Sequence, residues 1–254
     1  MKPGKYGELI RWICDAEHRY VLNGIPWTKR PADPTAAELH KQGSTPKNLV
    51  LELTSPFHGT GRNITGDRFF SGVPLCEELL FRHRLTYLGT LMSNKREIPP
   101  ILHRSLEEKD SVFVKGGKND SVVLCSYQAK SKKKVLLIST MHSRAIVEPN
   151  FPKKTEMQLH YNASKCGVDV CDQMAKMYTV RTRVNRYPMV QFQNVLDIKG
   201  INTFTIFNAT NPTWSTATEK YRRREFLQRL SKELARRMME RRRQIPNLSL
   251  LHKM

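Results

Sequence analysis

The sequence from Tyr161 to Phe207, YNASKCGVDVCDQMAKMYTVRTRVNRYPMVQFQNVLDIKGINTFTIF, carries the pattern that decides the fold. Its first part predicts a helix over Gly167–Met177, and a spacing of three residues places Asp169 and Asp172 on one face of that helix. Far upstream, Asp67 in GRNITGDRFFSGVPL follows a short strand-like run. Carboxylates that converge from distant segments are what a divalent-metal site for phosphoryl transfer needs, because hard cations prefer oxygen ligands.

These aspartates also have a purely structural interpretation. Asp169 is typical of the first turn of a helix, where a carboxylate interacts favourably with the N-terminal dipole. Asp67 follows Gly66, a combination that is common in turns. The spacing alone leaves both interpretations open.

The charge of the chain favours an anionic partner. The 254 residues carry a formal net charge of +20 and the pI is about 10.0. A polyphosphate backbone is the first candidate and an acidic membrane surface the second. No apolar run reaches the ~18 residues of a membrane span, and the N-terminus lacks a signal-peptide core. We therefore expect a soluble intracellular protein that does not span a membrane and that has an anionic partner.

The cysteines indicate a reducing compartment. There are five, they form no CxxC pair, and an odd number of unpaired thiols is typical of the cytosol or nucleus. Cys166 and Cys171 could ligate zinc, but no His or Cys cluster completes four ligands. We do not expect a structural zinc ion.

Hydrophobic periodicity and turn residues predict the elements upstream of residue 100. We expect two strands within Lys5–Leu22, a loop over Pro26–Lys47 with a short helix at Thr35–His40, strands at Leu49–Leu53, Arg62–Thr65 and Thr86–Leu91, and a helix over Pro74–Arg82. Asp67 then lies at the carboxyl end of a strand.

From Ser111 the pattern changes to β-structure. SVFVKGG, DSVVLCSYQAK and KKVLLISTMH alternate or are continuously apolar and are separated by turn signals, which predicts a small antiparallel β insertion. The lysine cluster Lys130–Lys134 is either a solvated turn or a phosphate contact. His142 is expected to serve packing or hydrogen bonding rather than metal ligation.

Two further helices are predicted near the C-terminus. Pro188 suits a first helical turn, and an apolar face follows it, made of Phe192, Val195, Leu196, Ile201, Phe204 and Phe207. Glu219–Gln244 predicts a basic amphipathic helix that ends before Pro246. Such a helix lies on DNA, on an anionic membrane or against a partner, or it packs with a solvated basic face. Arg241–Arg243 is a weak match to a nuclear-import signal.

Five blocks, in order, resemble the transposase domain of piggyBac elements and of the host proteins derived from them. The blocks are KPGKYGELIRWICDAEHRYVLNG, GTGRNITGDRFFSGVPL, LGTLMSNKREIP, YNASKCGVDVCDQM and NRYPMVQFQNVLDIKGINTFTIF. They cover most of residues 1 to about 240. Their order and spacing make the resemblance specific.

The resemblance implies an α/β fold: an RNase H-like mixed sheet of five strands flanked by helices, with a small antiparallel β insertion and a basic C-terminal helix. Residues 1–97 would form the first part of the core, 98–156 the β-rich insertion, 157–211 the last acidic helix and the helix after it, and 212–254 the basic helix.

The resemblance also assigns site residues. Asp67 takes the position of the second catalytic aspartate, Asp169 that of the third, and Asp172 the accompanying acidic position. Together they are the candidate ligands of Mg²⁺ or Mn²⁺. The candidate DNA contacts are Lys95, Arg96, Arg181, Arg183, Arg186 and Tyr187, the last where the family more often has Trp.

The family's first catalytic aspartate lies upstream of the first block, where this sequence has only Met1 before Lys2. We therefore expect a DNA-binding protein whose DNA cleavage is impaired. Two alternatives are an active cut-and-paste transposase completed by a further N-terminal segment, and a protein-interaction module. The resemblance further implies a nuclear location and a homodimer or a related transposase-derived partner. The apolar face Phe192–Phe207 would lack its own partner and expose an interface.

Overall fold

A computed structural model describes residues 9–26, 45–148, 154–184, 186–215 and 219–244. The chain divides into two compact units, Met1–Val170 and Cys171–Met254, and the division falls within helix α5 (Gly167–Met177). Each unit is described by itself. The helix predicted at Thr35–His40 lies outside the described residues. No helix among the described residues is long and apolar enough to cross a membrane.

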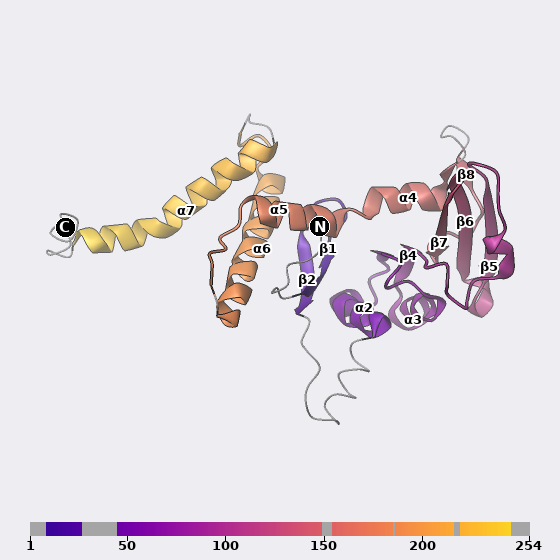
Figure 1. Cartoon of the computed structure of the whole chain (residues 1–254). Coiled ribbons are helices and arrows are strands. Elements are labelled where there is room, and N and C mark those ends of the chain that lie inside the picture. The colour runs from indigo at the N-terminus through magenta and orange to yellow at the C-terminus, as the bar shows by residue number, and fades with distance from the viewer. Residues whose placement is uncertain (1–8, 27–44, 149–153, 185, 216–218, 245–254) are drawn as a thin grey trace, which may run out of the picture. The chain divides into compact units, whose positions relative to one another are not determined.

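The first unit contains a mixed five-stranded sheet (Figure 1). The strands lie in the order β3 (Asn63–Gly66), β4 (Thr86–Thr90), β7 (Lys133–Ser139), β6 (Val122–Lys130) and β5 (Ser111–Gly116). β3 and β4 are parallel, and every other neighbouring pair is antiparallel. The predicted antiparallel β region therefore continues the same sheet as the strand that precedes Asp67.

Three kinds of smaller element complete the first unit. β1 (Ile10–Cys14) and β2 (Val21–Pro26) form a hairpin; β1 lies within the predicted range, whereas β2 extends four residues beyond the predicted end at Leu22. β8 (Val147–Glu148) pairs with β9 (Lys154–Thr155). The helices are α2 (Pro46–Thr54), α3 (Val73–His83) and α4 (Glu156–Ser164), and the short 3₁₀ turns are Ser55–Phe57, Pro100–His103 and Lys118–Asp120.

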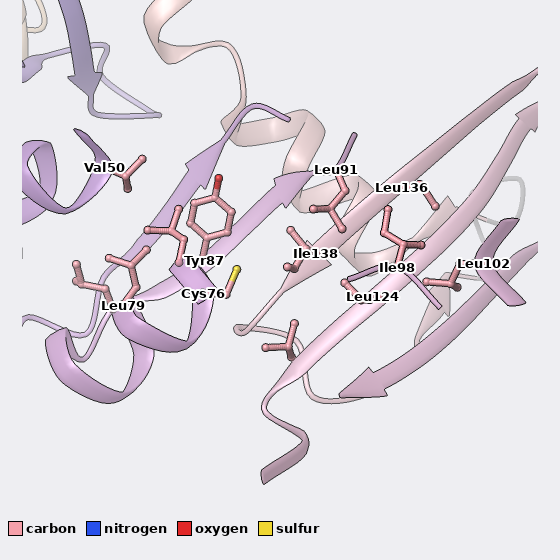
Figure 2. Close-up of a cluster of buried hydrophobic side chains, with 13 residues drawn as sticks. Val50, Cys76, Leu79, Tyr87, Leu91, Ile98, Leu102, Leu124, Leu136 and Ile138 are labelled. Carbon is pink, nitrogen blue, oxygen red and sulfur yellow. The ribbon is translucent and has the colours of Figure 1, made fainter. Parts of the chain in front are cut away.

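The alternation of side chains along the strands places a core on each face of the sheet, because successive residues of a strand point to opposite faces. One core joins α2 and α3 to the sheet, with Val50, Leu79, Tyr87, Leu124 and Ile138 among its buried members (Figure 2). The other joins α4 through Met157 to Leu88, Val123, Cys125, Tyr127 and Leu137. The sheet is therefore a buried and rigid layer.

The prediction of a strand at Leu49–Leu53 is wrong, since this segment lies in α2. The Thr45 side chain accepts a hydrogen bond from the Asn48 amide at 3.3 Å, and Pro46 stands in the first turn. Both are start signals for a helix. The apolar run is short, and a buried helix segment of that length has the same pattern as a strand.

The second unit is helical. The last turns of α5 are followed by α6 (Tyr187–Thr210) and α7 (Glu219–Arg243), as predicted. Pro188 stands in the first turn of α6. An aromatic cluster joins α6 to α7 through Phe204, Phe207, Trp214 and Phe226.

Candidate functional site

Asp67 follows the end of β3 and lies next to the end of the neighbouring strand β4. Because the two strands are parallel, Asp67 after β3 and Thr90 at the end of β4 lie at the same edge of the sheet. Thr90 Oγ1 donates to Asp67 Oδ1 at 3.5 Å. Gly89 makes this approach possible, since a Cβ there would lie only 2.8 Å from the carbonyl oxygen of Gly66.

The backbone at Asp67 is held in a turn. The amides of Phe70 and Ser71 donate to the Asp67 carbonyl at 2.9 and 3.2 Å, and Ser71 Oγ donates to the same oxygen at 3.1 Å. Ser71 Oγ also lies 2.9 Å from the buried Tyr87 hydroxyl. Burial raises the pKa of the Tyr87 phenol, so it stays protonated. Asp67 is thus a turn residue, and its carboxylate is exposed from a fixed position.

Tyr161 on α4 reaches the sheet edge at which Asp67 lies. Its hydroxyl is 3.5 Å from Thr90 Oγ1, and α4 is joined to β3 by a 2.8 Å hydrogen bond between Ser164 Oγ and Thr65 Oγ1. The pKa of Tyr161 is raised, first by burial and then by the charges of Asp67 and Asp169. Both carboxylates therefore lie within electrostatic reach of one phenol oxygen.

Asp169 and Asp172 lie on the predicted helix. Asp169 is exposed in the first turn of α5, and Asp172 follows three residues later on the same face, beyond the division between the two units. The first-turn position agrees with the structural interpretation and leaves the carboxylate available. In the part of the chain that the structure describes, no group of three or more His, Cys, Asp or Glu side chains could hold a metal ion.

The donor atoms at this edge are of the kind that Mg²⁺ or Mn²⁺ prefers. Asp67 and Asp169 offer carboxylate oxygens, and Thr90 adds a hydroxyl. Mg²⁺ usually keeps several waters and takes one or two protein carboxylates. The described residues do not supply enough acidic ligands for a pair of ions.

The candidate DNA contacts lie in both units. Lys95 and Arg96 follow β4 in the first unit, and Arg96 is exposed. Arg181, Arg183, Arg186 and Tyr187 lie on the segment between α5 and α6 or at the start of α6, and all four are exposed.

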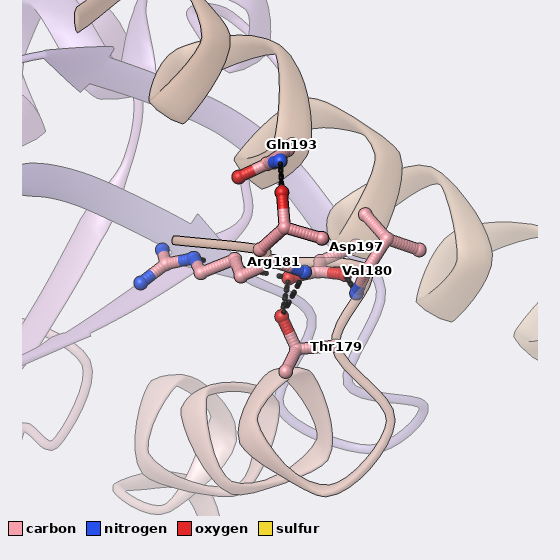
Figure 3. Close-up of polar contacts among 6 residues, drawn as sticks. Thr179, Val180, Arg181, Gln193 and Asp197 are labelled. Atoms are coloured by element: carbon pink, nitrogen blue, oxygen red, sulfur yellow. Dashed lines mark hydrogen bonds and ion pairs between the residues drawn. The ribbon is translucent and has the colours of Figure 1, made fainter. Parts of the chain in front are cut away.

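Asp197 fixes this segment of the second unit (Figure 3). It is buried on α6, and it accepts hydrogen bonds from Thr179 Oγ1 at 2.7 Å and from the Val180 amide at 2.8 Å. The Nε atom of Arg181 lies 4.0 Å from Asp197 Oδ2. A buried carboxylate thus holds the backbone from which the exposed arginines project.

The sequence reasoning missed Thr90, Tyr161 and the Ser71–Tyr87 pair. The signal for Thr90 was present, because it ends the strand after the one that precedes Asp67. Tyr161 opens the decisive stretch, but its position depends on where α4 packs.

The lysine cluster Lys130–Lys134 contributes one side chain to the protein's own structure. The ammonium group of Lys134 donates to the carbonyl oxygens of His103 at 3.0 Å and Arg104 at 2.6 Å.

The comparisons with known proteins show the family of the chain. Residues 1–204 match the family model described as Transposase IS4. A piggyBac transposase, solved by cryo-EM as a synaptic complex with hairpin DNA, is similar to this chain with a TM-score of 0.81 and 33% sequence identity. The similarity covers 97% of this chain and 50% of that one, so the chain spans half the length of this relative. No curated protein matches the chain.

The family match over most of the chain, together with the fold, places the chain in a DDE-type transposase family. The chain belongs to this transposase family and is of the piggyBac type. The predicted α/β fold with a mixed five-stranded sheet flanked by helices is confirmed.

Proposed function

We propose that this chain is a DNA-binding transposase module in which Asp67 and Asp169 supply two carboxylates of the strand-cleavage site. The observation that carries the proposal is the sheet edge where Asp67, Thr90 and Tyr161 meet and where the charge of Asp169 acts on the same phenol. The net charge of +20 supports a nucleic-acid partner.

Asp67 and Asp169 would hold Mg²⁺ or Mn²⁺. When bound, such an ion supplies Lewis-acid stabilisation of phosphoryl oxygens and lowers the pKa of a bound hydroxyl. The chain's own contribution is position: the backbone turn fixes Asp67, and Thr90 and the protonated Tyr161 orient the polar edge around it. Exposed Arg and Lys side chains hold the DNA backbone.

With Asp67 and Asp169 as the two carboxylate ligands, we propose that the 254-residue polypeptide binds one divalent ion weakly and cleaves DNA poorly by itself. A further acidic residue from another polypeptide segment would complete a two-ion site. Nuclear location is part of the same proposal, and the exposed Arg241–Arg243 at the end of α7 supports it.

The test compares Mn²⁺ binding by calorimetry in the parent chain and in Asp67→Asn, Asp169→Asn and Asp120→Asn variants. Asp120 is an exposed residue on the Lys118–Asp120 turn with φ 52°, a conformation that Asn tolerates, so it is a matched control. We expect weak binding of one ion, lost in the first two variants and kept in the control. Tight binding of two ions, or binding that survives both site variants, would contradict the proposal.

A second candidate function rests on the surface of α6. Phe192, Val195 and Leu196 are 55%, 48% and 41% exposed, which is unusual for three large apolar side chains within five residues. This face would join a second copy of the chain or a related transposase chain. Sedimentation of the parent and of a Phe192→Ser variant tests whether this face is an interface between chains. The variant becomes more monomeric than the parent only if it is.

A further inference from the structure

A hollow lies beside the candidate catalytic edge in the first unit. Its volume is about 440 Å³, within the range of small-ligand sites. Its wall includes Arg68, which directly follows Asp67, and Leu91, which directly follows Thr90. The amide of Arg68 also donates to Asp67 Oδ1 at 2.7 Å. The hollow therefore begins where the catalytic edge ends.

The side chains around this hollow have the chemistry of an anion site. Arg68, His103 and Lys134 contribute basic groups, and Ser93 and Asn94 contribute neutral donors. None of the residues that line it, all in the described part of the chain, carries a carboxylate. A cation would find no ligand of opposite charge here, whereas a phosphate group would find several donors.

Lys134 has a defined place in this arrangement. Its ammonium group donates to the carbonyl oxygens of Leu102, His103 and Arg104, which fixes the segment that carries His103. Its donors are therefore engaged by the protein, while its positive charge remains at the wall. Arg68 is exposed and keeps its guanidinium available, and a guanidinium binds phosphate with two parallel hydrogen bonds.

The floor of the hollow is apolar. Leu91 is buried, Leu136 is buried on β7, and Met92 lies beside them. An apolar floor with a basic rim suits a unit that carries both a sugar face and a phosphate. Inorganic phosphate alone would make no use of the floor.

We infer that this hollow binds one nucleotide unit of a DNA strand, with its phosphate on Arg68, and so guides the strand toward Asp67. The inference rests on the proposed function, since it names where the DNA backbone lies next to the carboxylates. The segment Leu91–Asn94 leads directly into Lys95 and Arg96, so the phosphate site and the predicted DNA contacts form a continuous stretch of chain.

The experiment measures the affinity of the full chain for a short hairpin-ended duplex by fluorescence anisotropy over a series of salt concentrations. The variants are Arg68→Gln, His103→Gln and the control Arg82→Gln. Arg82 is exposed on α3 and pairs with Glu78 at 3.4 Å, away from the hollow. Arg68→Gln and Arg82→Gln remove the same charge, so they change the long-range field equally.

We expect Arg68→Gln to weaken DNA binding several-fold and to reduce the slope of log K against log salt by about 1. His103→Gln should weaken binding less, and Arg82→Gln should show only the small loss that follows from the weaker long-range field. Unchanged far-UV circular dichroism and melting temperature in each variant would assign the loss to the surface. Arg68 and His103 are both exposed, so both variants should fold.

Three outcomes would overturn the inference. If Arg68→Gln and Arg82→Gln bind DNA equally well, the hollow is not on the path of the strand, although the proposed function stands. If the parent itself does not bind DNA, the inference and the proposed function both fail. If thymidine 5′-monophosphate or inorganic phosphate binds the parent in an Arg68-dependent way while DNA affinity is independent of Arg68, the hollow takes a free ligand.

Discussion

In the unit Met1–Val170 the proposed site residues Asp67 and Thr90 lie at the edge of a buried sheet, whereas in the unit Cys171–Met254 the basic residues lie on helix surfaces and on the exposed segment between α5 and α6. The carbonyl oxygen of Asp67 accepts a hydrogen bond from Ser71 Oγ, and Ser71 Oγ also contacts the hydroxyl of the buried Tyr87. On α7, every residue from Ser231 to Gln244 is exposed, and Leu234 is 74% exposed. Chemistry on a phosphodiester needs fixed atoms, while attraction to a polyanion needs only charge that is free to adjust.

The largest expected effect separates the two kinds of surface. Leu79 is fully buried in the core between α3 and the sheet, so Leu79→Ala should destabilise the first unit by about 2–5 kcal/mol through the lost transfer energy and the cavity. Leu234→Ala removes the same atoms from an exposed position and should change stability by less than about 0.5 kcal/mol. Urea denaturation with hydrogen exchange of β4 and α7 amides checks both values.

Equal effects of the two leucine substitutions would contradict this comparison. A large loss at Leu234 would mean that the exposed half of α7 is covered in solution by another copy of the chain. Repeating the melt at several protein concentrations would then reveal the association, because a dimer makes stability depend on concentration.

A smaller effect is expected at the one buried carboxylate that fixes the basic segment of the second unit. Asp197→Asn keeps the shape but replaces one acceptor by a donor, which removes a partner from either Thr179 or Val180. A cost of about 1–3 kcal/mol is expected, as for an unsatisfied buried group. Denaturation of α6, followed by hydrogen exchange, measures it.

The matched control is Glu240→Gln on the exposed part of α7, which changes the net charge by the same amount. If charge alone controlled DNA affinity, both variants would bind DNA slightly more tightly. Because Asp197 positions the backbone that carries Arg181, we expect its variant to bind less tightly than Glu240→Gln. The same affinity in both would show that the segment does not need to be fixed.

The smallest expected effect is on pH dependence, and it is confined to the first unit. The pKa of His58 lies below its ordinary value of 6.5, first because of burial and then because of the stacked His83 ring 3.8 Å away. The folded state then binds fewer protons than the unfolded state below about pH 6.5, so stability falls as the pH falls through that region. Burial also lowers the pKa of His142, so His142 contributes to the loss of stability at lower pH as His58 does.

His58→Gln should therefore reduce the loss of stability between pH 7.5 and pH 5.5, as measured by urea denaturation at the two values. The described residues of the second unit contain no histidine, so protection of α6 amides should change little over the same range. A His58→Gln variant with the parent's full pH dependence would assign the effect to His142 or to the other histidines.

The local elements were largely predictable. Pro188 and the i,i+3 aspartates predicted α6 and α5, the Gly116-Gly117 and lysine turns predicted the antiparallel strands, and the charge pattern predicted α7. Each of these signals lies within one segment of chain. The run Leu49–Leu53 was ambiguous for the same reason, since a run of five residues with four apolar side chains fits either a strand or a helix and only the Thr45 cap and tertiary packing decide.

The sequence by itself determined the family, the helix that carries Asp169 and Asp172, and the excess of positive charge. Only the tertiary structure decided that β3 lies parallel to β4, so that Asp67 meets Thr90, and that Tyr161 comes to the same edge. It also decided that Lys134 holds carbonyl groups while Arg68 stays exposed beside the hollow. The physical reason is that propensity and charge belong to neighbouring residues, whereas a site joins residues that only packing brings together.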